Sequence, residues 1–471
     1  MKANLVERMQ YGRRRGSVAL ALLAIPAVLA AAPDPAGSQW PQWRGPLQNG
    51  IAPEARPPVS WSESSNVAWK VRIPGSGTST PIIWGNQIFI QTAISAGTGA
   101  AAAGAKPETP APAAPAEGDQ RRRGGSGGPG GGMRSETPGG AFRFALLSLD
   151  RETGKTQWQK SLREEVPHEG HHRDHGFASH SPVTDGDHVW SYFGSRGLHC
   201  LDLKGDLIWS KDLGRMQTRN SFGEGSSPAL FGDTLVVNWD HQGDDFIAAF
   251  DKKTGTELWR QPRAEDTSWA TPLVVMHEGK PQVITSATSK IRSYDLATGK
   301  LLWECAGMTA NVIPTPVAAD GVVYPISGFR GAALLAIRLG GSGDLTGTDS
   351  ILWRHGKNTP YVPSPLLYDG KLYFFSGNNG MLSCFEAKSG RALIDAERLD
   401  ALQGVYASPL GADGRVYLVG RNGTAVVIKN SGSLDVLATN RLGEGIDASP
   451  AAVGRDLFLR GRTHLYCLRE K

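Results

Sequence analysis

Five of the eleven histidines in this chain lie in one short stretch, HEGHHRDHGFASH, at residues 168–180. Imidazoles and carboxylates at this density could bind zinc, copper or iron. The candidate ligands for a divalent metal are His168, His171, His172, Asp174 and His175. The spacing is not the helical H-E-x-x-H of metalloproteases. Two other interpretations stay open: a structural loop whose histidines hydrogen-bond to backbone and carboxylates, and a loop with a histidine general base.

Four further polar residues are candidate binding residues: Asp240 and His241 in NWDHQGDDF, Arg196 in GSRG and Arg330 in GFRG. Oxygen ligands suit calcium, but the first stretch lacks a D-x-D-x-D-G pattern, so a solvated turn is the favoured interpretation. An arginine between glycines or small residues in a turn could hold an acidic group, although a solvated turn is again favoured. The sequence assigns no catalytic residue.

An internal repeat of about 44 residues predicts the elements that carry these side chains. Each unit opens with small or hydroxyl-bearing residues before a proline, followed by short apolar runs with turn signals. The prolines are Pro81, Pro182, Pro228, Pro272, Pro316, Pro365, Pro409 and Pro450. This pattern is typical of four short strands per unit. The sequence therefore predicts an all-β fold, an eight-bladed β-propeller of four-stranded antiparallel blades.

Most units close with a glycine four residues before a tryptophan. These tryptophans are Trp158, Trp209, Trp259 and Trp303, with Trp353 closing the fifth unit and Ile394 and Val436 the next two. The eighth unit lacks a closing strand, whereas an extra strand with Trp69 precedes the first unit. We expect this N-terminal strand to complete the last blade and close the ring, with tryptophans between blades. The histidine-rich stretch is then a blade-to-blade connection near the central channel.

The motifs LSLDRETGKTQW, AAFDKKTGTELW and RSYDLATGKLLW resemble those of the PQQ-like β-propeller repeat family. That family includes quinoprotein dehydrogenases and the propeller lipoprotein of the outer-membrane β-barrel assembly machinery. The resemblance covers about residues 40–471 and implies the fold, but it says little about function. The opening WPQWRGPLQNG and the histidine-rich stretch are similar to those of exported members of this group.

The resemblance implies specific features that this chain lacks. Quinoprotein members hold pyrroloquinoline quinone (PQQ) in the channel with calcium, often beneath a disulfide of adjacent cysteines. Here Cys200, Cys384 and Cys467 occupy like positions in separate units, which indicates buried strand residues. We therefore disfavour PQQ and retain a divalent metal as the candidate cofactor. The assembly lipoprotein carries a lipid-modified cysteine directly after its signal peptide, but the first cysteine here is Cys200.

The N-terminus predicts export. A basic run precedes the apolar stretch SVALALLAIPAVLAAA, so we expect a signal peptide at residues 1–32 and a periplasmic or secreted protein; an uncleaved anchor is the alternative. The apolar run is short for a membrane span, and we expect none after signal removal. An N-terminal extension at 33–60 precedes the propeller at 61–471. The Ala/Gly/Pro-rich insertion at 94–140 is expected to be disordered.

Composition narrows the function classes. The net charge of +5 is small and lies partly in the leader, so it provides no case for a nucleic-acid partner. The favoured hypothesis is a monomeric binding or scaffold module for a protein or cell-envelope partner. The alternatives are a quinone- or metal-dependent periplasmic oxidoreductase that works at the channel mouth, and a carbohydrate-binding propeller. The last would use exposed aromatic residues such as Trp40, Trp43 and Trp269.

Overall fold

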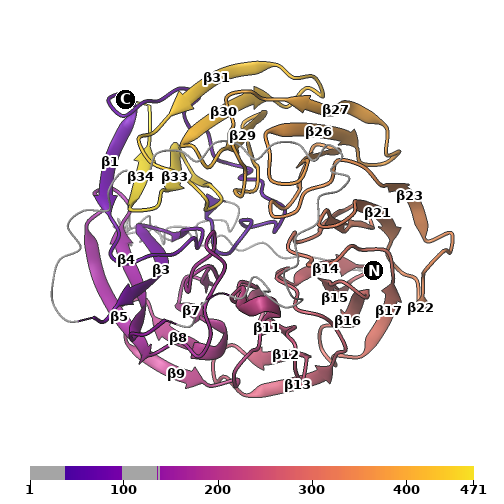
Figure 1. Ribbon diagram of the computed structural model, residues 1–471, viewed down its shortest axis with the longest axis horizontal. Coiled ribbons are helices and arrows are strands. Elements are labelled where there is room, and N and C mark those ends of the chain that lie inside the picture. Colours follow the sequence, from indigo (N-terminus) through magenta and orange to yellow (C-terminus); the bar gives the residue numbers. More distant parts are fainter. Residues whose placement is uncertain (1–37, 98–134, 136–137, 471) are drawn as a thin grey trace, which may run out of the picture. The chain divides into compact units, whose positions relative to one another are not determined.

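The computed structural model describes residues 38–97, 135 and 138–470, all of which belong to one compact unit. The predicted signal peptide and most of the 94–140 insertion lie outside the described residues. Within them, no helix has the length and apolar character needed to cross a membrane. The described chain folds into eight sheets, antiparallel except for one short parallel pair, that surround a common axis as the blades of a β-propeller (Figure 1). The predicted fold class is confirmed.

The first four blades follow one another along the chain. Their strands are β2 (Ile82–Trp84), β3 (Gln87–Ser95), β4 (Phe142–Asp150) and β5 (Thr156–Glu165); β6 (Val183–Thr184), β7 (His188–Tyr192), β8 (Leu198–Asp202) and β9 (Leu207–Lys211); β10 (Ala229–Phe231), β11 (Thr234–Trp239), β12 (Phe246–Asp251) and β13 (Glu257–Pro262); and β14 (Leu273–His277), β15 (Lys280–Ser286), β16 (Ile291–Asp295) and β17 (Leu301–Cys305). Two 3-10 turns are present: η2 (Gly194–Arg196) lies between β7 and β8, and η3 (Arg219–Ser221) lies in the connection between β9 and β10.

The fifth blade is less regular than its neighbours, and the sixth and seventh return to four strands. The strands are β18 (Val317–Ala319), β19 (Val322–Tyr324), β20 (Ile326–Ser327), β21 (Ala333–Arg338) and β23 (Ile351–His355); β24 (Leu366–Tyr368), β25 (Lys371–Phe375), β26 (Met381–Glu386) and β27 (Ala392–Arg398); and β28 (Leu410–Ala412), β29 (Arg415–Val419), β30 (Thr424–Lys429) and β31 (Val436–Arg441). A short strand between β21 and β23, β22 (Gly343–Asp344), pairs instead with β17.

The last blade joins the two ends of the described chain. It contains β32 (Ala451–Val453), β33 (Asp456–Arg460), β34 (His464–Leu468) and the N-terminal β1 (Val67–Arg72). β1 pairs antiparallel with β34, with Trp69 opposite Cys467. The predicted ring closure is confirmed. It covers the strand edge that the missing eighth closing strand would leave open.

A belt of hydrogen bonds links the blades where the innermost strands begin. For seven of the eight repeat prolines, the residue before the proline donates its backbone N–H to the hydroxyl of the equivalent residue in the next blade. Seven such bonds of 2.9 to 3.0 Å run from Thr80 through Ser181, Ser227, Thr271, Thr315, Ser364 and Ser408 to Ser449. We call these residues the hydroxyl belt. It explains why the repeat keeps a small hydroxyl residue there, since these buried N–H groups need an acceptor.

The closing tryptophans pack between neighbouring blades, as predicted. Indole N–H groups donate to a carbonyl of the following blade at 2.8 to 3.1 Å, and each ring lies against a turn glycine of that blade. The donors are Trp69, Trp158, Trp209, Trp259 and Trp353, and the glycines are Gly154, Gly205, Gly255, Gly299 and Gly390. Trp303 is an exception, because β22 lies beside it and its buried indole N–H has no partner.

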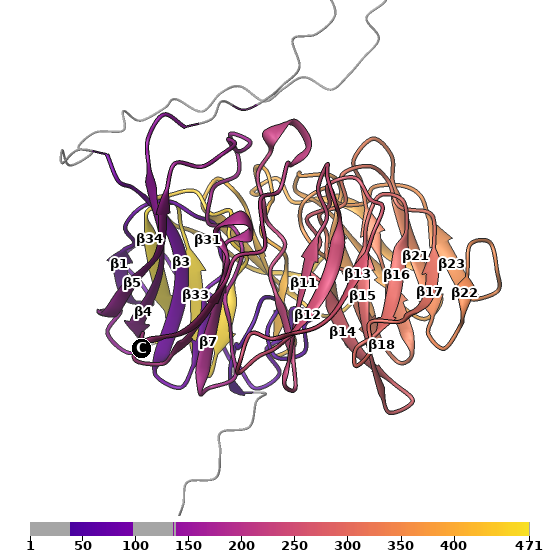
Figure 2. The same ribbon diagram turned by 90° about the horizontal axis from the view of Figure 1, so that it is seen from below.

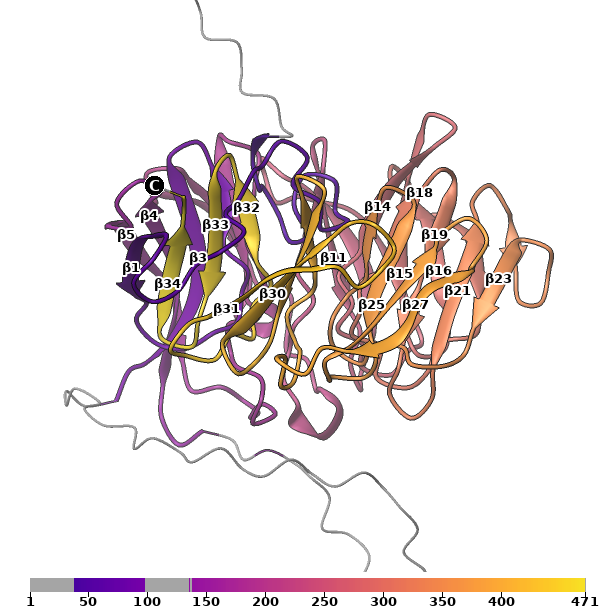
Figure 3. The same cartoon turned by 90° about the horizontal axis from the view of Figure 1, so that it is seen from above.

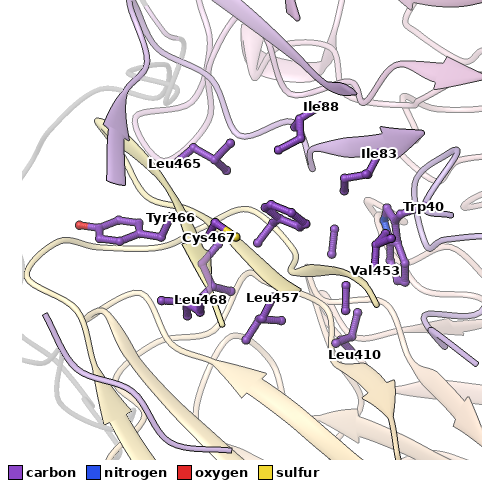
Figure 4. Close-up of a cluster of buried hydrophobic side chains, with 14 of the residues drawn as sticks. Trp40, Ile83, Ile88, Leu410, Val453, Leu457, Leu465, Tyr466, Cys467 and Leu468 are labelled. Carbon is purple, nitrogen blue, oxygen red and sulfur yellow. The ribbon is translucent and has the colours of Figure 1, made fainter. Parts of the chain in front are cut away.

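Residues 38–60, the described part of the N-terminal extension, cross the inside of the ring (Figure 1). Trp40 pairs with Ile83 of the first blade, and Ile51 pairs with Gly411 of the seventh. Trp40 packs among apolar side chains of the inner strands, including Leu410 and Val453 (Figure 4). The buried Arg44 guanidinium donates to the carbonyls of Pro365 and Pro409, both at 2.8 Å. The extension is thus an internal part of the propeller.

Candidate functional site

A cavity of about 390 Å³ lies on the face of the ring where the blade-to-blade connections meet. The side views show the strands running between this face and the opposite one (Figures 2 and 3). Trp43 of the N-terminal extension and several hydroxyl-belt residues line the cavity from inside the ring. We call this space the channel cavity.

The residues three positions before the eight repeat prolines all line the channel cavity. These residues are Thr78, Ser179, Gly225, Trp269, Ile313, Val362, Tyr406 and Asp447. In an extended segment, positions one and three residues before the proline face the same side. The residue one position before the proline belongs to the hydroxyl belt, and the residue three positions before it lines the cavity. This set contains small, apolar, aromatic and acidic side chains, so the scaffold is regular while the wall chemistry varies.

An ion-pair network forms one part of the wall. Arg421, in the seventh blade, places Nη2 3.0 Å from Asp174 Oδ1 and Nε 2.6 Å from Asp447 Oδ1. The Tyr406 hydroxyl lies 3.3 Å from the second oxygen of Asp174, and the guanidinium lies over the Tyr406 ring. Burial opposes ionisation of Asp174, but the hydrogen bond and charge of Arg421 outweigh it and hold its pKa below the ordinary value. Burial, with the nearby Asp174 charge, raises the pKa of Tyr406 to about 12.

Aromatic side chains form another part of the wall. Phe329 and Tyr361 stack with their ring centroids 4.7 Å apart. The Trp269 indole donates to the Gly223 carbonyl at 2.7 Å, which holds that ring in place. Arg330 is exposed at the cavity, and its guanidinium lies 5.3 Å from the Phe329 centroid. In the described part of the chain, Arg330 forms no ion pair with a carboxylate. It is therefore available to an acidic group on a ligand.

Comparison with known proteins supports the fold assignment. A family profile described as "Outer membrane protein assembly factor BamB" matches residues 144–392, more than half of the 471 residues. The chain belongs to the PQQ-like β-propeller family. No curated protein matches the chain.

Solved structures show the same fold across most of this family member. The match to a quinohemoprotein alcohol dehydrogenase from Comamonas testosteroni spans 92% of this chain and 81% of the dehydrogenase, with 10% identity and a TM-score of 0.59. A europium-containing methanol dehydrogenase covers 90% of this chain and 89% of its own, with 10% identity and a TM-score of 0.58. BamB from Moraxella catarrhalis covers 69% of this chain and 93% of its own, with 13% identity and a TM-score of 0.49. At 10% identity, the likeness to the two dehydrogenases concerns the fold alone.

The carboxylates of the channel cavity do not fit a metal-bound quinone of the kind that other family members hold. The two carboxylates that line it, Asp174 and Asp447, both bond to the Arg421 guanidinium. A divalent cation at this position would compete with a cation already paired to both ligands. The donor set therefore does not fit that cofactor.

Three of the predicted histidine-loop residues line the channel cavity: His172, Asp174 and His175. His175 lies 3.0 Å from the Glu224 carbonyl through Nε2 and 3.0 Å from the Ser179 hydroxyl through Nδ1. Burial lowers its pKa to about 4, so the ring is neutral at pH 7. Such contacts are those expected of a structural loop; metal binding by the five residues stays a prediction.

His171 and His168 face other neighbours. His171 Nδ1 lies 2.8 Å from the His172 carbonyl, and its ring packs edge-on against Phe177. Within the described residues, the one group of three metal-ligand side chains with donor atoms within 4.8 Å of one another is His168, Glu169 and Glu224. Of the five predicted ligands, only His168 belongs to this group.

The expectation of solvated turns is wrong for Asp240, His241 and Arg196, which are all buried. Asp240 forms an ion pair with Arg263, in which both side chains are fully inaccessible to solvent. Arg196 bonds to Glu224 at 2.7 Å. The physical reason is that a blade-to-blade connection covers each turn: Arg263 lies in the connection after β13, and Glu224 in the connection between β9 and β10. Arg330 is the predicted turn arginine that does face solvent.

The three tryptophans expected to be exposed differ in where they lie. Trp40 is buried at 1% exposure, so that expectation is wrong; its ring packs inside the N-terminal extension's apolar cluster. Trp43 and Trp269 line the channel cavity. The expected buried positions of Cys200, Cys384 and Cys467 are confirmed.

The sequence reasoning missed most of the cavity wall. No motif marks the wall residues Asn311, Tyr361, Tyr406 and Asp447, because each is a lone polar or aromatic residue in its connection. A usable signal was present. Reading the residue three positions before every repeat proline would have found Tyr406, Asp447 and Trp269 together.

Proposed function

We propose that this protein is an exported binding module that receives part of a protein or cell-envelope partner in the channel cavity. The observation that carries the proposal is the convergence of all eight positions three residues before the repeat prolines on one cavity. Loops on a rigid scaffold are where binding residues gather, and about 390 Å³ lies in the range of ligand sites. The family description as an outer membrane protein assembly factor supports an envelope partner.

The wall chemistry suggests what the inserted part of the partner offers. Phe329, Tyr361 and Trp269 provide aromatic area, which anchors contacts efficiently because few rotamers are lost. Arg330 adds an exposed cation without an ion-pair partner among the described residues. The matching group is an apolar or aromatic side chain next to a carboxylate. The Arg421 network is internally paired and serves to position Asp174 and Asp447.

Site-specific photo-crosslinking in the producing cells tests this function. A photoreactive residue replaces Val362 in the cavity wall, and a control replaces exposed Asp320, in the turn that follows β18. We expect a discrete adduct from position 362 and none from 320. A second change, Ile313→Trp, fills the cavity and should abolish the adduct. Equal adducts at both positions, or an adduct that persists with Ile313→Trp, would contradict the proposal.

Carbohydrate binding is a second candidate, because Trp43 and Trp269 line the same cavity and aromatic faces bind sugar rings. Calorimetric titration with neutral and uronic-acid oligosaccharides distinguishes it. Saturable binding that Trp269→Ala removes would favour a sugar ligand, whereas no heat with any oligosaccharide would eliminate it.

A further inference from the structure

The hydrogen bond of His168 determines which of its ring nitrogens has a free lone pair. Nε2 lies 2.6 Å from the Met216 carbonyl oxygen. A carbonyl can only accept, so Nε2 must carry the proton and donate. In the neutral ring, Nδ1 is then an acceptor. That Nδ1 is buried and has no hydrogen-bond partner.

His168 shares its surroundings with two carboxylates. One donor atom of each of His168, Glu169 and Glu224 lies within 4.8 Å of the other two. Ionised carboxylates accept and cannot donate. Two ionised carboxylates and an imidazole therefore converge, an arrangement that is costly away from solvent unless a cation or a proton lies between the carboxylates.

The charges around this group leave one carboxylate without a cation. Glu224 receives the Arg196 guanidinium at 2.7 Å and the Ser195 N–H at 2.6 Å. Glu169 receives only the backbone N–H and hydroxyl of Thr218. It takes part in no ion pair in the described chain.

A second observation points to a ligand at the same place. Glu169 and Glu224 line a small cavity of about 10 Å³ together with His180 and Arg196. His180 is 2% exposed, and its Nδ1 has no hydrogen-bond partner. Its imidazole is thus a second buried group with an unused nitrogen beside the two carboxylates.

We propose that a divalent metal ion of the zinc or manganese class binds between His168 Nδ1 and the carboxylates of Glu169 and Glu224, with water completing its coordination. One imidazole and two carboxylates suit such ions. Each ligand already has the supporting contact that metal ligands usually have: Met216 for His168, Thr218 for Glu169 and Ser195 for Glu224.

The metal has a structural role at this position. His168 and Glu169 belong to the connection between the first and second blades, and Glu224 to the next connection. His175 and Phe222 of these two connections line the channel cavity. The ion would hold the two connections together behind one wall of that cavity. It differs from the predicted five-residue site, with which it shares His168 alone.

Metal analysis of protein purified without a histidine tag tests the site. We expect close to one zinc or manganese per chain in the wild type and in the control His171→Ala, which changes the same loop outside the trio. His168→Gln and Glu169→Gln should each lower the affinity about tenfold or more. Adding Zn²⁺ or Mn²⁺ to chelator-treated protein should raise the melting temperature of wild type and His171→Ala only.

Two results overturn the proposal. The first is chelator-treated wild type that binds neither Zn²⁺ nor Mn²⁺ in calorimetry. The second is His168→Gln and Glu169→Gln variants that retain metal as wild type does. The Glu169→Gln change keeps side-chain shape, so circular dichroism can confirm that a lost metal does not reflect a lost fold.

Discussion

Arg421 lies 3.0 Å from Asp174, although 247 positions separate them in the chain. Arg421 belongs to the seventh blade, and Asp174 to the connection after the first. The same guanidinium also holds Asp447, in the connection after the seventh blade. This one side chain therefore ties the histidine-rich loop to distant parts of the ring, and it sets the polar part of the channel cavity.

Replacing Asp174 by Asn should lower the free energy of unfolding by about 1–2 kcal/mol at pH 7, since the ion pair is only partly shielded from solvent. The pKa of Asp174 is below its ordinary value in the folded state, despite burial, because of Arg421. Its stabilisation is therefore present above the unfolded pKa of about 4 and is lost as pH falls through the lower folded pKa. Urea denaturation from pH 7 to pH 3 should show the wild-type advantage shrinking below pH 4. Asp206→Asn, at an exposed turn, should change stability by less than about 0.5 kcal/mol at every pH.

The tryptophan between blades makes one turn glycine more sensitive than another. Gly390 and Gly370, both in the sixth blade, have similar left-handed φ angles of 73° and 70°. A Cβ at Gly390 would lie 2.7 Å from the Trp353 ring, whereas one at Gly370 would meet nothing within 4 Å. Gly370→Ala should cost about 1 kcal/mol from backbone strain, and Gly390→Ala about 1–3 kcal/mol more from the clash. Equal losses in denaturant melts would show that the ring moves aside freely.

The hydroxyl belt should contribute to stability through its acceptors. Ser364→Ala removes the acceptor of the buried Thr315 N–H, and an unsatisfied buried donor costs about 1–3 kcal/mol. Ser364→Thr keeps the hydroxyl, and threonine occupies the equivalent position in other blades. We expect thermal denaturation to show a lower melting temperature for Ser364→Ala and a melting temperature closer to that of wild type for Ser364→Thr. If threonine and alanine were equally destabilising, side-chain volume rather than the hydrogen bond would dominate.

The N-terminal extension should depend on Arg44. This arginine is 3% exposed, and burial lowers its pKa to about 9, which leaves it charged at neutral pH. Its guanidinium contacts backbone carbonyls instead of a carboxylate. Arg44→Ala leaves those carbonyls without a donor and should lower the free energy of unfolding by about 2–4 kcal/mol. Limited proteolysis should then cleave within residues 38–60 faster than in wild type. The control Arg56→Ala, at an exposed residue of the same segment, should be cleaved at the wild-type rate.

The repeat determined the fold at the level of the sequence. Most strands within a blade are joined by short turns. Their pairing therefore depends on local alternation, prolines and turn glycines, which are visible in the sequence. Counting strands was enough to place β1 beside β34, because a ring cannot close with one strand missing from its last blade. Even the cavity wall has a local signal, since Trp269, Tyr406 and Asp447 share one position in the repeat.

Only the tertiary structure decided which of these residues meet. The partners of Asp240, Arg196 and Asp174 are Arg263, Glu224 and Arg421. Arg263 and Glu224 lie in blade-to-blade connections, and Arg421 lies in the seventh blade. No repeat pattern encodes such pairs, because the connections differ in length and sequence while the blades stay alike. The same holds for the N-terminal extension inside the ring and for His168 with Glu224. Sequence periodicity specifies strand pairing within a blade, whereas the site is made of contacts by the connections, which only the folded ring brings together.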